Sequence, residues 1–338
     1  ELVDWDGPAC VDWSAMKSAP LSLLAMVLGL AFLFGSPVVA EAQKCISIRL
    51  VVPHSVGSAT DVVMRAYAAT INRRGSGPLI KVINVTKKSV KWQRIWSKTD
   101  GCNLLATTQS LVADHLANKR KPIWSRLKPI AMISRTPLLV VARGGLKDAT
   151  LANVLEKALQ DPNSVGIGEA RSPLERMMLM SLEDMTGARF RIMTYDTGRE
   201  SYSALLAGKL DIGIISITAG RRRVEHKELQ ALAVSSEARS SVLPAVPTLK
   251  EEGIRGTFSI DRGIMASKET PDELAAEIAG WFEKASEVAE LADRLAEYGT
   301  IVVHKGPDEY TRYFENLTAD WQEMIQRAAG KQTRRRAS

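Results

Sequence analysis

From Ile46 onward, short runs rich in β-branched residues and leucine alternate with longer amphipathic stretches. This alternation is typical of strand–helix–strand units around a parallel sheet, so the sequence predicts an α/β protein. Strands are expected at 46–52, 79–84, 103–107, 129–133, 138–142, 164–167, 189–193, 211–215, 231–234 and 301–303. Helices are expected at 60–74, 151–159, 173–186, 201–207, 271–285, 288–298 and 308–329.

Two predicted helix starts carry a hydroxyl residue directly before a proline, at Thr270-Pro271 and Ser172-Pro173. A hydroxyl oxygen can accept a hydrogen bond from an unpaired amide of the first turn, and proline suits the first helical position. We therefore expect Thr270 and Ser172 to cap the helices that follow them.

The segment from Met16 to Ala42 has the three parts of a secretory leader. Lys17 supplies the positive start, the apolar run 21–34 is short for a membrane span, and the small residues of 40–42 suit cleavage. The pattern predicts a signal peptide at 16–42, with an uncleaved membrane anchor as the alternative. Residues 1–15 precede the only plausible start methionine and are expected to be a non-native extension.

Charge and length constrain the rest of the chain. Residues 1–42 hold one basic and five acidic residues, so the formal charge rises from +7 for the whole chain to +11 for the remainder. This surplus favours anionic partners, although an inert basic surface explains it equally well. The basic cluster at 331–338 is expected to be a disordered tail, and no nucleic-acid partner is expected. About 296 residues after the leader favour two lobes over one simple core.

Two cysteines, Cys45 and Cys102, remain after the predicted leader, each just before a predicted strand. An oxidising compartment permits a disulfide if these strands are neighbours, and two separate buried thiols are the alternative. Lys44 stands where a lipid-modification signal needs a small residue, so we expect no lipid anchor.

The sequence lacks the common signatures of catalysis. It has no Walker loop, no His-Glu-x-x-His, no Gly-x-Ser-x-Gly and no metal-type spacing of cysteine and histidine. Ser55 follows His54, but adjacency in sequence does not establish a nucleophile–base pair. We therefore expect no enzymatic activity, no cofactor and no metal site.

Five segments carry the features of one family in a fixed order. IRLVVPHSVGSATDVVMRAYA runs from a Val-Pro strand end through a glycine turn to Thr-Asp, and TDGCNLLATT places Asp-Gly before a leucine strand. LKPIAMISRTPLLVVAR and YDTGRESYSALLAGKLDIGI follow, and ELQALAVSSEARSSVLPAVPTLKEEGI keeps a Leu-Pro-x-Val-Pro-Thr turn. From about Ile46 to Trp321, the chain resembles the solute-binding proteins of tripartite tricarboxylate transporters, the Bug family of periplasmic receptors.

This resemblance implies a type II periplasmic-binding-protein fold, in which two doubly wound lobes are joined by two crossover segments and enclose a ligand cleft. The implied boundaries are 43–141 plus 262–330 for lobe 1, 142–261 for lobe 2 and 331–338 for the tail. Hinge motion around 142 and 261 would close the lobes over a small carboxylate. The first and third strands of lobe 1 would be parallel neighbours, which favours a Cys45–Cys102 disulfide.

The expected ligand site combines helix starts that face the cleft. A helix start offers a carboxylate unpaired amides and the positive end of the helix dipole, and such starts gather beyond the carboxyl ends of parallel strands. Lobe 1 is expected to contribute His54, Ser55, Val56, Gly57, Ser58, Ala59, Thr60, Asp61, Thr107, Thr108 and Gln109. Lobe 2 is expected to contribute Gly168, Ala170, Arg171, Ser172, Tyr195, Thr197 and Gly198.

Several of these residues have expected roles. The small residues 57–59 would let a ligand approach the main chain, and Asp61 would brace the turn; an ordinary strand-to-helix turn is the alternative. Arg171 could grip a carboxylate with two parallel hydrogen bonds, or pair with Glu169 or Glu175 at the surface.

Three departures from the family pattern bear on the ligand. NVTKKSV at 84–90 lacks the glycines of the family's Asn-Arg-Pro-Gly-Ala-Gly-Gly stretch. Ile215 stands where some members carry an aspartate suited to an ammonium group, which disfavours an amino-acid ligand. Asp261-Arg262 replaces a Trp-Tyr pair; we expect Arg262 to form a hinge salt bridge with Asp261 or a neighbour, with a ligand contact as the alternative.

These observations predict a monomeric periplasmic solute-binding protein that delivers a small organic carboxylate to the membrane subunits of a tripartite transporter. Two alternatives use the same cleft. One is an exported receptor that presents its ligand to a membrane sensor kinase, and the other is a divergent member that has lost binding.

Overall fold

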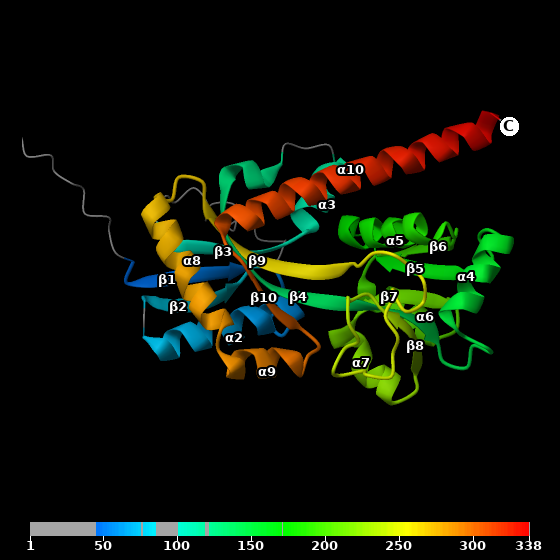
Figure 1. Ribbon diagram of the computed structural model, residues 1–338, viewed down its shortest axis with the longest axis horizontal. Coiled ribbons are helices and arrows are strands. Elements are labelled where there is room, and N and C mark those ends of the chain that lie inside the picture. The colour runs from blue at the N-terminus through cyan, green and yellow to red at the C-terminus, as the bar shows by residue number, and fades with distance from the viewer. Residues whose placement is uncertain (1–44, 76, 86–100, 119–121, 171, 338) are drawn as a thin grey trace, which may run out of the picture. The chain divides into compact units, whose positions relative to one another are not determined.

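The computed structural model describes residues 45–75, 77–85, 101–118, 122–170 and 172–337 (Figure 1). The predicted leader at 16–42, the extension at 1–15 and most of the altered loop at 84–90 lie outside the described residues. Within the described ranges, no helix is both long enough and apolar enough to cross a membrane.

Ten strands form the sheet in the described part of the chain. They are β1 (Ser47–Val52), β2 (Leu79–Asn84), β3 (Asn103–Thr108), β4 (Leu127–Arg143), β5 (Gly166–Ala170), β6 (Arg191–Tyr195), β7 (Ile212–Ser216), β8 (Leu229–Val234), β9 (Ser259–Ser267) and β10 (Ile301–Lys305). Their order is β2-β1-β3-β9-β4-β7-β5-β6, and β8 and β10 both pair with β4.

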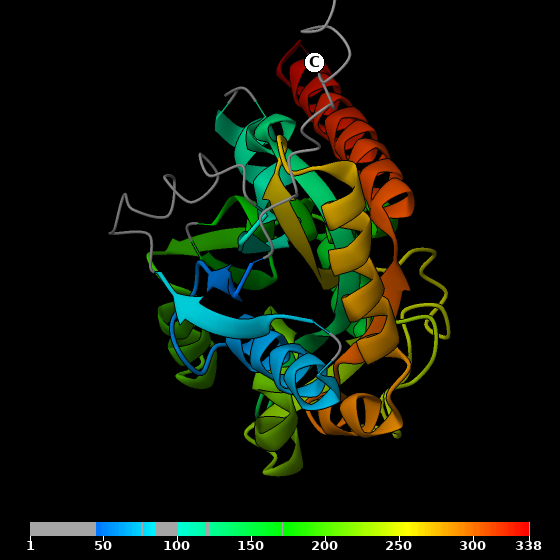
Figure 2. The same ribbon diagram turned by 90° about the vertical axis from the view of Figure 1, so that its left-hand side faces the viewer.

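Helices cover both faces of the sheet. They are α2 (Ala59–Arg74), α3 (Ser110–Asn118), α4 (Leu151–Gln160), α5 (Pro173–Thr186), α6 (Gly198–Leu206), α7 (Ile217–Glu225), α8 (Asp272–Ser286), α9 (Ala289–Ala296) and α10 (Pro307–Ala337), with a short 3₁₀ helix, η3 (Ile123–Arg126). The helices α2, α8 and α9 bury one face of the half-sheet formed by β1, β2, β3, β9, β10 and the start of β4, and α3 and α10 bury the other (Figures 1 and 2). Around the second half-sheet, α4 and α5 lie opposite α6 and α7. The predicted α/β class is confirmed.

The two half-sheets are connected by the antiparallel strands β4 and β9. Residues 127–137 of β4 pair with β9, and residues 138–143 pair with β7 and β8. The separate strands expected at 129–133 and 138–142 are thus one strand, and that expectation is wrong. Pro137 lacks an amide donor but lies opposite Ser259, at the last pair with β9, so the strand passes through it.

Strand β9 was not predicted because two charged residues, Asp261 and Arg262, are its third and fourth residues. Asp261 and Arg262 are 4% and 1% exposed, and charged residues are rarely so buried without partners. The carboxylate of Asp261 accepts two 2.8 Å hydrogen bonds from Arg135. Arg262 donates to the hydroxyls of Thr60 and Thr136. These contacts, which the sequence does not reveal, allow the segment to be a buried strand.

The remaining predicted elements are present, with ends shifted by up to three residues except in α10, which continues to Ala337, eight residues past the expected end at 329. Helices α3 and α7 are additional. The three consecutive arginines at 221–223 make α7 polar and hide its helical pattern. Its start is nevertheless well formed, because the Ser216 hydroxyl accepts a 3.3 Å hydrogen bond from the Ala219 amide.

Neither predicted hydroxyl cap is formed. Helix α8 begins at Asp272 with Pro271 in the capping position, and the buried Thr270 hydroxyl has no hydrogen-bond partner in the described structure. Ser172 does occupy the capping position of α5, with Pro173 first in the helix, but its side chain makes no capping hydrogen bond. Glu175 instead turns back and accepts a 2.6 Å hydrogen bond from the Ala170 amide.

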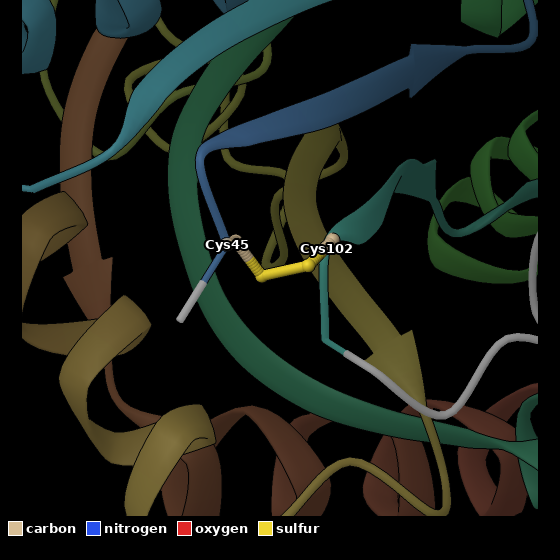
Figure 3. Close-up of a disulfide and its surroundings, with 2 residues drawn as sticks. All are labelled: Cys45 and Cys102. Atoms are coloured by element: carbon tan, nitrogen blue, oxygen red, sulfur yellow. A yellow bond between two sulfur atoms is a disulfide. The ribbon is translucent and has the colours of Figure 1, made fainter. Parts of the chain in front are cut away.

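Cys45 and Cys102 form the disulfide that the resemblance favoured (Figure 3). Strands β1 and β3 are parallel neighbours, with Arg49 opposite Asn103, so the two cysteines lie together where these strands begin. Their Cα atoms are 5.5 Å apart.

The C-terminal helix α10 contacts elements of the first half-sheet and also α5, which covers the second (Figure 1). Tyr310 and Phe314 pack on the first half-sheet, whereas Met324 packs with Met177 of α5. Arg327 also donates a 2.7 Å hydrogen bond to Asp184 of α5. The lobe boundaries at 141/142 and 261/262 remain predictions, and α10 crosses between the parts that they separate.

Candidate functional site

A cavity of about 460 Å³ lies beyond the carboxyl ends of β5 and β7. Its wall includes the first turns of α5, α6 and α7, which are three separate helix starts. Each start carries the positive end of a helix dipole and amides without a partner inside the helix. The cavity wall is therefore suited to a negatively charged group.

The start of α6 is fixed by a reciprocal pair of hydrogen bonds. The Thr197 hydroxyl accepts from the Glu200 amide at 3.2 Å, and the Glu200 carboxylate accepts from the Asp196 amide at 3.2 Å. Gly198 and Arg199 follow directly and line the cavity. Arg199 has no carboxylate within 4.0 Å among the described residues, so its positive charge is available to a ligand.

Helix α7 adds a second arginine to the cavity wall. The Arg223 guanidinium lies 4.3 Å from the centre of the Tyr202 ring and donates a 2.8 Å hydrogen bond to Glu228. The Tyr202 hydroxyl is buried and has no hydrogen-bond partner in the part of the chain described. Tyr202 lines the cavity, and its ring packs against the Arg223 guanidinium.

Two acidic residues lie on the α5 side of the cavity. Glu175 accepts the hydrogen bond from Ala170, yet burial and the nearby charge of Glu169 hold the pKa of Glu175 above its usual value. Glu169 accepts hydrogen bonds from Arg176 at 3.3 Å and Thr194 at 3.2 Å. Glu175 also lies against the start of α6, because a Cβ atom at Gly198 would lie 3.5 Å from its Oε1 atom.

The interior between these groups is largely apolar. It is lined by Leu138, Ile167, Met178, Leu205, Ile214 and Ile260, among others. Gly168 allows α6 to approach β5 closely, because a Cβ atom there would lie 2.4 Å from the Ser201 hydroxyl oxygen. A side chain at 168 would displace the helix start that faces the cavity.

The loop before α2 is held by Asp61, which is 1% exposed. Its carboxylate accepts hydrogen bonds from the Gly57 amide at 2.8 Å, from Asn84 at 2.8 Å and from Arg65 at 3.0 Å. Burial alone would raise the pKa of Asp61, but these hydrogen bonds together lower it. Asp61 braces the turn, as the sequence predicted.

The sequence model described as "Tripartite tricarboxylate transporter family receptor", TctC, matches residues 88–329. The chain belongs to this family. TctC proteins are periplasmic solute-binding receptors rather than enzymes.

Relatives of this TctC receptor agree along most of its length. Protein BugT of Bordetella pertussis is 24% identical over 313 residues, which cover 88% of this chain and 93% of BugT. An R. palustris protein solved with adipate has a TM-score of 0.70 at 21% identity, over 84% of this chain and 97% of that one. MatC from Rhodopseudomonas palustris, with bound malate, has a TM-score of 0.67 at 19% identity, over 82% and 98%. The shared fold is the two-lobed periplasmic-binding-protein fold that the sequence predicted.

The receptor brings together only some of the predicted site residues. Gly168, Ser172 and Gly198 line the cavity. Ala170, Tyr195 and Thr197 lie beside it at the ends of β5 and β6 and before α6, whereas Arg171 lies outside the described residues. No residue of 54–61 or 107–109 is among the described residues that line this cavity. The ligand contacts expected for residues 54–61 and 107–109 remain a prediction.

Three of the site residues expected in lobe 1, Thr107, Thr108 and Gln109, form side-chain hydrogen bonds with other residues of the receptor. Thr107 bonds to Tyr310 at 2.9 Å, and Thr108 donates to Ser110 at 2.8 Å. Gln109 donates to the Ser259 carbonyl at 2.6 Å and accepts from the Asp261 amide at 3.0 Å. The geometry gives these three side chains a structural role.

The sequence analysis missed most of the cavity wall. Arg199 directly follows Gly198 and could have been found as part of the same helix start. Arg223 and Tyr202 could not, because their contact depends on the unpredicted helix α7.

The expected Arg262–Asp261 salt bridge is absent from the described contacts, since Asp261 pairs with Arg135 instead.

Proposed function

We propose that this protein is a periplasmic solute-binding protein that captures a small organic carboxylate by hinge closure and delivers it to a tripartite tricarboxylate-type membrane transporter. The observation that carries the proposal is the convergence of three helix starts and Arg199 on one cavity. Preorganised amides and an unpaired guanidinium are the groups that bind carboxylates in proteins.

The route of closure follows from the strands that connect the half-sheets. Leu138 of β4 and Ile260 of β9 both line the cavity, so a bend of these strands would alter its opening. In the proposed closed state, the loop 54–61 approaches the ligand from lobe 1. The bound malate and adipate of the two R. palustris proteins support a carboxylate as the ligand class.

A thermal-shift screen of the receptor against mono-, di- and tricarboxylates tests the proposal. A ligand at a hundred times its Kd stabilises the folded state by about 2.7 kcal/mol. We expect Arg199→Met to weaken the binding of the best ligand, because it removes a positive charge from the cavity wall. Arg222→Met is the matched control, since Arg222 is exposed on α7 and does not line the cavity.

Two results would argue against the proposal: no carboxylate stabilises the protein, or Arg199→Met and Arg222→Met bind equally well. Delivery is tested separately, by comparing uptake of the identified ligand in cells that carry or lack the gene. Uptake that does not depend on the gene would contradict the proposed transport role, and the proposal of carboxylate binding would still stand.

A further inference from the structure

The Glu175 carboxylate lies at the start of α6, the surface that the proposed function assigns to the ligand. Its Oε2 atom accepts a 2.6 Å hydrogen bond from the Ala170 amide. Its Oε1 atom lies against α6, because a Cβ atom at Gly198 would be 3.5 Å from it. Glu175, Gly198 and Arg199 all line the cavity. An acidic side chain of the receptor therefore shares the electropositive surface that a ligand carboxylate needs.

We propose that Glu175 couples ligand binding to proton uptake: it takes one proton from solvent when a carboxylate binds at the start of α6. The protonated carboxyl keeps Oε2 as the acceptor for the Ala170 amide, and its Oε1–H group can donate a hydrogen bond to the ligand. The ligand carboxylate stays ionised, so the complex differs from the separate partners by one solvent proton. This inference rests on the proposed function and adds the regulation of the same site.

The first argument is the contact that binding would create. The amides of Gly198 and Arg199 have no hydrogen-bond partner among the described residues. A ligand carboxylate on these two amides would lie beside the Oε1 atom of Glu175. Two ionised carboxylates that share a site repel each other strongly, so the pKa of one rises and that group takes up a proton.

The surroundings strengthen this repulsion. The cavity is lined largely by apolar side chains, among them Leu174, Met178 and Leu205. Such surroundings screen charges less than water does. In the unliganded receptor, burial and the nearby charge of Glu169 already hold the pKa of Glu175 above its usual value. The negative charge of a bound ligand acts in the same direction.

The second argument is that no basic group neutralises Glu175. In the described part of the chain, no Lys, Arg or His nitrogen lies within 4.0 Å of its carboxylate. Arg176, the next residue, pairs instead with Glu169 at 3.3 Å. The Glu175 carboxylate therefore meets an incoming ligand with its own charge uncompensated.

The other charged or titratable residues near Glu175 come from β5, α6, α7 and the turns before α5 and α6. Those that line the cavity are Glu169, Arg199, Tyr202 and Arg223. Those in the turns are Arg171, which lies outside the described residues, and Asp196, which does not line the cavity. Arg223 already pairs with Glu228 at 2.8 Å. No histidine lines the cavity in the described ranges, so Glu175 is the group best placed to take up a proton near neutral pH.

The test is a calorimetric titration of the full mature receptor with malate and adipate, and with any other acid that stabilises it in the thermal-shift screen. Each titration is run from about pH 5.5 to about pH 7.5, in buffers of different protonation heat, which gives the number of protons taken up per ligand. We expect the affinity to fall as the pH rises, by up to about tenfold per pH unit, with uptake of up to about one proton.

Three variants assign the proton. Glu175→Gln keeps an oxygen for the Ala170 amide and a donor for the ligand but cannot ionise. It should bind at least about tenfold more tightly than the parent at about pH 7.5, with proton uptake reduced to that of the acid itself. Glu156→Gln, at an exposed site on α4, is the matched control and should keep the parental pH dependence. Glu169→Gln should retain most of the proton uptake, because Glu169 is already paired with Arg176.

The outcomes separate this inference from the proposed function. A pH dependence that is equal in the parent and in Glu175→Gln, or a parent that takes up no proton, would overturn the inference and leave carboxylate binding intact. Proton uptake that is lost in Glu169→Gln and kept in Glu175→Gln would overturn the assignment to Glu175. If no acid binds at any pH, the proposed function fails and the inference fails with it. The proton uptake of the parent decides the matter even if Glu175→Gln does not fold.

Discussion

The Nε atom of Arg262 lies 3.2 Å from the hydroxyl oxygen of Thr60, so the crossover strand β9 is tied to the first turn of α2. The Arg262 guanidinium also donates a 2.6 Å hydrogen bond to Thr136 of β4. Burial lowers the pKa of Arg262 to about 10, although the charge of Asp261 opposes this shift. The side chain therefore remains charged at neutral pH and joins three elements at the point where the half-sheets meet.

We expect Arg262→Ala to destabilise the protein by about 2–5 kcal/mol, because it leaves a cavity and removes the hydrogen bonds to Thr60, Thr136 and Ile260. Arg262→Lys should recover only part of this loss, since a lysine cannot reproduce the planar fork of the guanidinium. Chemical denaturation measures both effects. Arg222→Ala, at an exposed position, should stay within about 0.5 kcal/mol of the parent protein. A loss below about 1 kcal/mol for Arg262→Ala would show that these contacts do not stabilise the junction.

Removal of the Cys45–Cys102 disulfide should lower the free energy of unfolding by about 2–4 kcal/mol. The bridge spans 57 residues of sequence, and opening it restores conformational freedom to the unfolded chain. The double variant Cys45→Ser/Cys102→Ser should therefore unfold at lower denaturant concentration than the oxidised protein. Under reducing conditions the parent protein should behave like the variant, and a midpoint that does not respond to reductant would contradict the expectation.

Asp61 should stabilise the α2 loop in a pH-dependent manner. Its pKa in the folded protein is lowered, so its ionised form contributes stability above its ordinary pKa, and this contribution is lost as the pH falls through the folded value. We expect Asp61→Asn to cost about 1.5–3 kcal/mol at pH 7, because it weakens charge-assisted hydrogen bonds. Denaturation from pH 7 to pH 3 should show the difference from the parent shrinking below about pH 4. Asp293→Asn, at an exposed site on α9, serves as the control, and a difference that is constant with pH would refute the assignment.

Much of the fold could be predicted because its elements carry local patterns. The strands β1, β2 and β3 are apolar runs, and α2 has its Ser58 cap, which accepts from the Asp61 amide at 3.3 Å. Strand β9 and the unbroken strand β4 could not be predicted in this way. The buried charges of β9 are on Asp261 and Arg262. They are satisfied by Arg135 and Thr136 of β4, which are more than a hundred residues away in sequence.

The site was predictable where it depends on a helix start and not where it depends on packing. Gly168 directly follows the strand predicted at 164–167 and Gly198 lies at a predicted helix start, so both were identified from their positions, although Gly168 lies inside β5. Apolar residues such as Ile214 and Ile260 are indistinguishable in sequence from core residues, because both occur on buried strands. Only the arrangement of β7, β9 and α5 shows that they border an open volume.

The last prediction concerns Glu175, whose carboxyl group is half-buried against the cavity. Burial raises the pKa of Glu175, with a further contribution from Glu169, so the folded protein holds this proton to higher pH than the unfolded chain. Stability from this group is therefore greatest at low pH and falls as the pH rises from the unfolded pKa through the folded one. Glu175→Gln keeps an oxygen that can accept from the Ala170 amide and removes the charge.

We expect Glu175→Gln to be more stable than the parent protein at pH 7 to 8, and the difference to shrink toward pH 4, where the parent carboxyl is protonated. Thermal denaturation across this pH range measures the effect. Glu156→Gln, at an exposed site on α4, should show no such trend because its side chain remains in water. If Glu175→Gln is less stable than the parent at pH 7, the ionised carboxylate stabilises the start of α5 through Ala170, and burial does not disfavour its charge.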